Sequence, residues 1–185
     1  MPQFGGFLDL MDARSFSSLW FWLVLIGVWT LTGRSVLGVP SDVIARAGRD
    51  PSGQAGMTLL DWLSLCLPRW RLTDGGGAVL LAVTGFVLTG LAVLGFAYGL
   101  EAAQALTLLL VPYATLTGLR LLLARKLMPL LTGAQDGGIA PDLAAADALR
   151  AINRHRWAVL LLGMIAVAAA AMWGTIWSLP YPSGI

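Results

Sequence analysis

Charged residues are scarce in this 185-residue chain: Asp, Glu, Lys and Arg make up 12% of it, whereas 57% of the residues are hydrophobic. Soluble domains typically carry about 25% charged residues. Such a deficit is typical of a surface that faces lipid, so the composition indicates an integral membrane protein. The net charge of +2 does not indicate a partner nucleic acid, because the basic residues flank apolar segments and are better placed to meet anionic lipid headgroups.

Cysteine and histidine each occur once, as Cys66 and His155. A single cysteine excludes an internal disulfide, and it excludes a Cys-ligated zinc or iron–sulfur site within this chain, since such sites need about four ligands. A single histidine likewise excludes a two-His metal or haem site. No nucleophile or acid stands at a motif spacing from His155. The sequence therefore predicts a protein that is not an enzyme and has no metal or cofactor of its own.

The basic residues are concentrated in two segments. Eleven of the twelve Lys and Arg residues lie in residues 34–71 and 120–156, and Arg14 is the remaining one. In membrane proteins, Lys and Arg accumulate in the loops that stay on the cytoplasmic side. We therefore expect a multi-pass protein of the bacterial inner membrane, cytoplasmic or intracytoplasmic, with both basic segments in the cytoplasm and both termini in the periplasm.

Four apolar stretches predict an all-α fold with four transmembrane helices in a single membrane domain, residues 1–185. Residues 78–123 are too long for one crossing of a ~30 Å hydrocarbon core at ~1.5 Å per residue, so they should form a hairpin that turns near Glu101. Asp9 and Asp12 replace the basic start of a secretory signal, so the first stretch is expected to be a retained span. The expected spans are residues 17–37, 78–98, 102–123 and 157–177, and the expected cytoplasmic loops are residues 38–77 and 124–156.

Residues 57–67 form a short amphipathic segment that ends at Pro68. Two interpretations stay open: a helix lying in the membrane interface, or a helix packed on the cytoplasmic ends of the spans. Aromatic and basic side chains near the ends of spans favour the headgroup layer. On this basis the residues predicted at the lipid interface are Trp20, Trp22, Arg69, Trp70, Arg71, Trp157, Trp173 and Trp177.

Small residues recur every four positions in two of the expected spans, as Gly95 and Gly99 and as Ala166, Ala170 and Gly174. Such spacing allows close helix packing in lipid, although glycine and alanine are also generally enriched in membrane helices. The sequence predicts packing at these five positions, against a helix of this chain or of another protein. Composition does not distinguish the two.

His155 lies among Asn153, Arg154 and Arg156, at the expected cytoplasmic mouth of the last span. One interpretation is an axial ligand of a chlorophyll or haem, and the other is a solvated side chain between two arginines. Arg34 and Arg120 stand near cytoplasmic ends, where their head groups can snorkel to the interface. No ionisable residue stands near the centre of an expected span, which disfavours a transporter.

Residues 11–47 (MDARSFSSLWFWLVLIGVWTLTGRSVLGVPSDVIARA) and residues 85–112 (GFVLTGLAVLGFAYGLEAAQALTLLLVP) resemble a small family of alphaproteobacterial membrane proteins from relatives of the purple bacteria. The most distinctive parts are residues 14–20 and 38–40. Members are often labelled "component of SufBCD complex", which implies iron–sulfur assembly. Cys66 alone cannot scaffold a cluster, and the resemblance assigns no functional residue.

From these features we expect a non-catalytic accessory or structural subunit of a larger membrane complex. The purple-bacterial lineage of the resembling family implies that this complex is energy-transducing, either a photosynthetic reaction centre with its light-harvesting antenna or a respiratory complex. The partners would be that complex, through helix packing, and anionic lipids. A shared interface could also hold bacteriochlorophyll, carotenoid or quinone. The alternative is a membrane-anchored assembly or scaffolding factor that recruits a soluble partner through its cytoplasmic loops, including one for iron–sulfur assembly.

Overall fold

The computed structural model describes residues 19–178 of the chain. The described chain is all-α apart from one short antiparallel hairpin, as the sequence predicts. Its elements are α2 (Leu19–Gly33), β1 (Ser35–Val36), β2 (Val39–Pro40), α3 (Ser41–Ala47), α4 (Gln54–Cys66), the 3-10 helix η2 (Leu67–Trp70), α5 (Asp74–Ala92), the π-helical turn η3 (Val93–Ala97), α6 (Glu101–Gln135) and α7 (Pro141–Ser178).

Three helical stretches are long and apolar enough to cross a membrane: Gly75–Ala97, Glu101–Gln135 and Pro141–Thr175. The first two form the predicted hairpin, which turns at Gly99 with a φ of +75°. The remaining predicted span, the first one at residues 17–37, corresponds to α2, a shorter apolar helix of 15 residues. At ~1.5 Å per residue this helix extends about 22 Å, less than the ~30 Å thickness of a bilayer core.

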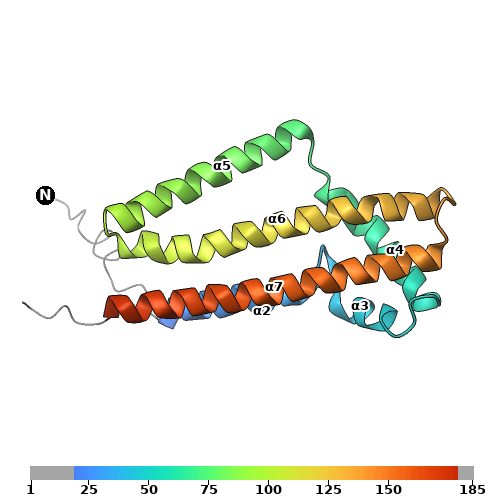
Figure 1. Cartoon of the computed structure of the whole chain (residues 1–185), viewed down its shortest axis with the longest axis horizontal. Coiled ribbons are helices and arrows are strands. Elements are labelled where there is room, and N and C mark those ends of the chain that lie inside the picture. The colour runs from blue at the N-terminus through green and yellow to red at the C-terminus, as the bar shows by residue number, and fades with distance from the viewer. Residues whose placement is uncertain (1–18, 179–185) are drawn as a thin grey trace, which may run out of the picture.

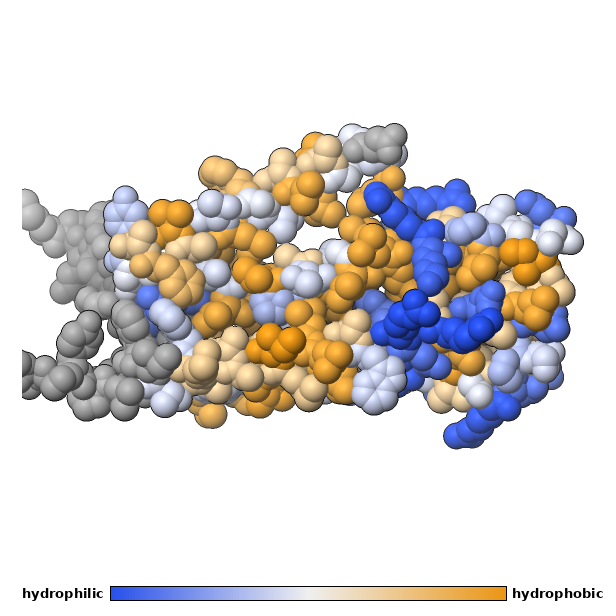
Figure 2. Space-filling model, in the orientation of Figure 1, coloured by the Kyte–Doolittle hydropathy of each residue, from blue (hydrophilic) through white to orange (hydrophobic). Residues whose placement is uncertain are grey.

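The long helices lie side by side along the longest axis of the molecule (Figure 1). The α5–α6 turn, the start of α2 and the end of α7 lie at one end, which we call the outer end. The α6–α7 loop lies at the other end with α3 and α4. Figure 2 shows hydrophilic residues gathered toward this second end and hydrophobic residues over the middle. The two basic segments therefore meet at one end of the helices, which we call the basic end.

Helices α6 and α7 are longer than the expected spans 102–123 and 157–177. α6 continues through Arg125 and Lys126 to Gln135, and α7 begins at Pro141, so residues 124–156 are a continuous helical hairpin except for the short turn 136–140. At ~1.5 Å per residue the two helices extend about 52 and 57 Å, well beyond a bilayer core. The extension forms because Leu123, Leu127 and Leu131 continue an apolar face at helical spacing.

The first predicted span, residues 17–37, is wrong at its C-terminal end. The helix ends at Gly33, and the chain turns back as the β1–β2 hairpin, with Val36 paired to Val39. Leu37 and Gly38, the two residues of the turn, both have positive φ, as a type I′ hairpin requires. Burial of the Leu37 side chain offsets the unfavourable φ of this non-glycine residue.

At the basic end, the hairpin, α3 and α4 pack on the extensions of α6 and α7 around one hydrophobic core. We call this unit the basic-end module. Leu59, Leu63 and Cys66 of α4 are buried in it, which favours the packed interpretation of the amphipathic segment over a helix that only lies in the interface. On the opposite face of α4, Leu65 stays 71% exposed. The core members are Val36, Leu37, Val39, Val43, Ile44, Ala47, Leu59, Leu60, Leu63, Cys66, Leu67, Leu123, Ala124, Leu127, Leu131, Ala144, Ala145, Ala148, Leu149, Ala151 and Ile152.

Helix α5 has little contact with the rest of the chain. No side chain described in residues 75–92 is buried, and Leu81 and Phe86 are 75% and 81% exposed. α5 meets α6 at the outer end and diverges from it toward the basic end (Figure 1), and Figure 2 shows an opening beside it. An apolar helix with this exposure needs lipid or another protein around it.

Candidate functional site

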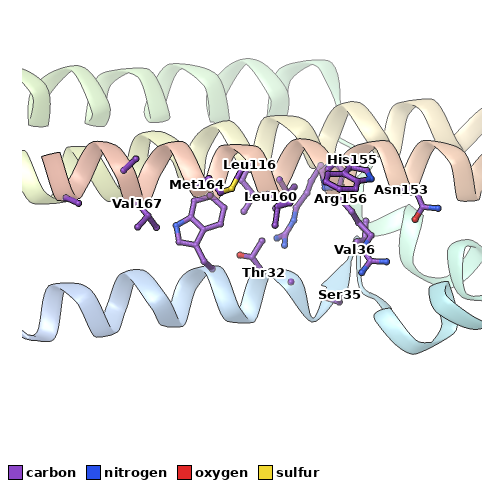
Figure 3. Close-up of a pocket in the computed structure, with 18 residues that line it drawn as sticks. Thr32, Ser35, Val36, Leu116, Asn153, His155, Arg156, Leu160, Met164 and Val167 are labelled. Carbon is purple, nitrogen blue, oxygen red and sulfur yellow. The ribbon is translucent and has the colours of Figure 1, made fainter. Parts of the chain in front are cut away.

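A cavity of about 880 Å³ lies between α2, α6 and α7. Its wall changes character along its length. Near the basic end it is lined by Arg120, Asn153, His155 and Arg156, and farther along α7 by Leu160, Met164, Val167, Ala168 and Ala171. Figure 3 shows Leu160 and Val167 directed from α7 toward α2, from which Thr32 approaches. The cavity is therefore amphipathic, with its polar end next to the basic-end module.

The polar end of the cavity carries positive charge without a matching acid. No Asp or Glu is among its lining residues. The ion pairs found within residues 19–178, Arg46–Asp42 and Arg150–Asp147, involve neither Arg120 nor Arg156. Among the described residues, the Nε atom of Arg120 is buried and has no hydrogen-bond partner. A buried guanidinium nitrogen without a partner is unfavourable, so this end of the cavity suits an anionic group.

His155 is 8% exposed, so the solvated interpretation of this residue is wrong. It lies on the basic side of the apolar stretch that begins at Trp157. Burial, and after it the positive charge of Arg120, lowers the pKa of the imidazole. This shift favours the neutral imidazole, and the two arginines carry the formal charge of the cavity wall.

One close contact sets the distance between α2 and α7. A Cβ atom placed on Gly163 would lie 3.2 Å from Cε3 of Trp29, so the indole rests directly on the α7 backbone. Both residues line the cavity. The glycine admits the large ring at this point.

At the outer end, Gln104 joins three helices. It is 2% exposed; its side-chain Nε2 donates to the carbonyl of Gly95 at 2.8 Å, and its Oε1 accepts from Nε1 of Trp173 at 3.0 Å. The Trp173 ring also contacts Phe96 edge-on, with ring centroids 5.1 Å apart. We call Gly95, Phe96, Gln104 and Trp173 the outer cluster. Within the described chain, it fastens η3 and α7 to α6.

The small residues singled out in the sequence occupy different environments. Ala166 and Ala170 are buried within this chain, and Gly174 is partly buried in α7. A Cβ atom on Gly95 would lie 2.7 Å from the backbone nitrogen of Gln104, so this glycine permits close approach of η3 to α6. Gly99 has nothing within 4 Å of such an atom and supplies the positive φ of the turn. Internal packing therefore accounts for Gly95, Ala166 and Ala170.

The predicted interfacial residues are also distributed unevenly. Trp157 is exposed and Trp20 lies at the exposed start of α2, while the ring of Trp22 contacts that of Phe21. Trp177 falls in the last turn of α7. Two residues have internal contacts: the indole of Trp70 donates to the carbonyl of Leu37 at 3.2 Å, and Arg71 donates to Sδ of Met128 at 3.2 Å. Arg69 is exposed beside them on η2.

No group of three or more His, Cys, Asp or Glu residues that could hold a metal ion occurs within residues 19–178. Cys66 is a free thiol buried in the core of the basic-end module. Comparison of the chain with family models, with curated proteins and with solved structures finds no match. The site must therefore be interpreted from its own chemistry.

Gln104 and Arg120 have roles in the structure that differ from what their sequence context predicts. Gln104 is the only amide side chain in the apolar stretch 102–123, and an amide at such a position signals a hydrogen bond between helices. Arg120 was expected to snorkel, but its Nε is buried beside the cavity. In the sequence, the sign of this burial is that Arg120 lies inside the apolar stretch, ahead of Arg125 and Lys126.

Proposed function

We propose that this chain is a non-catalytic accessory subunit of a larger membrane assembly, and that α5 packs against helices of that assembly. The observation that carries the proposal is the exposure of α5, whose described side chains in residues 75–92 are all at least partly exposed. In lipid, helices associate through close packing at small residues. A Cβ atom added to Gly85 or Gly90 of α5 would have no atom of residues 19–178 within 4 Å, so both positions are available to another helix. That the assembly is energy-transducing is an expectation that rests on the lineage of the resembling family alone.

Replacing Gly85 and Gly90 by Leu tests this proposal. Both substitutions enter open space, so the fold of the chain itself should be preserved, whereas a packed partner helix would be displaced. We expect the double variant to reach the membrane at normal levels and to lose co-migration with its complex after mild extraction and native separation. Gly118→Leu, at an equally open position on α6, is the matched control. Unchanged migration of the double variant, or of the wild-type chain as a lone protein under several mild conditions, contradicts the proposal.

We further propose that the chain crosses the membrane four times and that α2 is the first crossing. Support comes from the contact of Trp29 with Gly163, which places α2 along α7, and from the apolar exposed side chains of α2. The basic end would face the cytoplasm and the outer end the periplasm, because Lys and Arg disfavour translocation. Both termini would then be periplasmic in the bacterial inner membrane.

Single cysteines introduced in a Cys66→Ser background test this topology by thiol labelling of intact cells. With an impermeant reagent we expect Ser52→Cys and Gln135→Cys to be protected, and Glu101→Cys and Ser183→Cys to be labelled. Labelling of Ser52→Cys and Gln135→Cys would show that the basic end faces the periplasm, opposite to this proposal. Protection of Ser183→Cys alone would leave an odd number of crossings.

The packed core of the basic-end module supports a second candidate, a membrane-anchored factor that recruits a soluble partner. Arg49 and Arg69 are exposed on this module and would meet an acidic surface. Reversing both charges should abolish recruitment while leaving membrane co-migration intact. The opposite outcome, in which only the α5 variant has an effect, favours the accessory subunit.

A further inference from the structure

We propose that the cavity between α2, α6 and α7 binds one anionic phospholipid, with its phosphate at Arg120 and Arg156 and an acyl chain along the apolar wall of α7. This site does not depend on the proposed partner assembly. It is defined by the cavity, by its two arginines and by the unpartnered Nε of Arg120.

The polarity of the cavity matches that of a phospholipid. Arg120, Asn153 and Arg156 gather at the end next to the basic-end module, where the headgroup layer would lie. Leu160, Met164 and the small residues beyond them form a wall without charge (Figure 3). Basic pockets between membrane helices are a recurrent way of holding anionic headgroups.

The length of the cavity also fits. Its apolar lining on α7 runs from Trp157 to Ala171, which at ~1.5 Å per residue is about 21 Å. One leaflet of the hydrocarbon core is about 15 Å thick, half of ~30 Å. The apolar part therefore has room for an acyl chain along its whole depth in the leaflet, with the phosphate left at the arginines.

The charges favour a phospholipid over a neutral quinone. Both are amphipathic, but a quinone offers only neutral carbonyl acceptors and would leave two guanidinium groups without a counter-charge. A phosphate accepts charge-assisted hydrogen bonds from arginine, often two at once. The imidazole of His155, which also lines this end of the cavity, can contribute a further polar contact.

Lipid titration of the purified full-length protein by native mass spectrometry tests the site, with phosphatidylglycerol and phosphatidylcholine of identical acyl chains as probes. We expect the wild-type protein to bind phosphatidylglycerol at least about tenfold more tightly, and Arg120→Gln or Arg156→Gln to remove about tenfold of that affinity. Arg154→Gln is the matched control. It removes the same charge from an exposed position on the same helix that does not line the cavity.

A second variant probes the apolar wall. Ala168→Leu adds bulk where the acyl chain would lie, and it should weaken binding of phosphatidylglycerol without changing the charge. If Arg120→Gln does not give a helical circular dichroism spectrum, the headgroup contact is tested with Arg156→Gln instead, because this position is exposed and the substitution should not disturb the fold.

Four outcomes overturn the proposal. Equal affinity for the two lipids shows that no anionic headgroup is recognised. An equal loss in Arg154→Gln shows general surface attraction in place of a defined site. Unchanged binding in Ala168→Leu shows that the acyl chain lies elsewhere. A quinone in the organic extract of the purified protein, together with no retained phospholipid, identifies the other occupant.

Discussion

The outer cluster gives the sharpest prediction about stability. Gln104→Leu keeps a side chain of similar size but removes both of its hydrogen bonds, leaving the Gly95 carbonyl and Nε1 of Trp173 without their partner. An unsatisfied buried group costs about 1–3 kcal/mol in proteins generally. In membrane proteins, hydrogen bonds between helices average about 0.6 kcal/mol and reach about 1.7 kcal/mol, because the unfolded chain in the membrane also finds partners. Two lost bonds therefore predict a decrease of about 1–3 kcal/mol in the free energy of unfolding.

A double-mutant cycle isolates the bond between α6 and α7. Trp173→Phe removes the Nε1 donor and retains an aromatic ring next to Phe96. Gln104→Leu, Trp173→Phe and the double variant would be unfolded reversibly in mixed micelles and compared with the wild-type protein. We expect a coupling energy of about 0.6–1.7 kcal/mol, since each single change already removes the shared bond. Additive effects of the two substitutions would refute the inference that this hydrogen bond joins the helices.

Three further predictions concern single residues. Gly95→Ala should destabilise the chain by about 1–3 kcal/mol in the same unfolding assay, because its Cβ atom would meet the Gln104 backbone. Gly90→Ala, in open space, should not destabilise it, and equal effects of the two substitutions would contradict the close approach of η3 to α6. Trp70→Phe should cost about 1 kcal/mol through the lost bond to the Leu37 carbonyl, and a neutral result would assign Trp70 to the interface. The thiol of Cys66 should resist a permeant maleimide until denaturant is added, and rapid labelling of the native protein would place it outside the core.

The all-α class of the protein and the positions of its long apolar helices could be predicted from the amino-acid sequence alone. Hydrophobic length and the scarcity of charge are properties of contiguous residues, so the hairpin around Gly99 and the apolar stretch after Trp157 could be read directly. The clustering of Lys and Arg likewise predicted that residues 34–71 and 120–156 lie at the same end of the helices, where the structure places them.

Which face of each helix is buried, and against which other helix, depends on contacts between residues far apart in the chain. The extension of α6 past Arg125 depends on the packing of Leu127 and Leu131 against α7. Charged residues on the other face of α6 lower the average hydropathy of this segment, so hydropathy alone does not predict that the helix continues. The roles of Gln104 and Arg120 likewise depend on residues far away in the chain. Gln104 bonds to Trp173, 69 positions away, and Arg120 faces a cavity walled by α2 and α7. Hydropathy measures whether a segment favours lipid, but a hydrogen bond or a cavity exists only once separate helices have been brought to a definite distance.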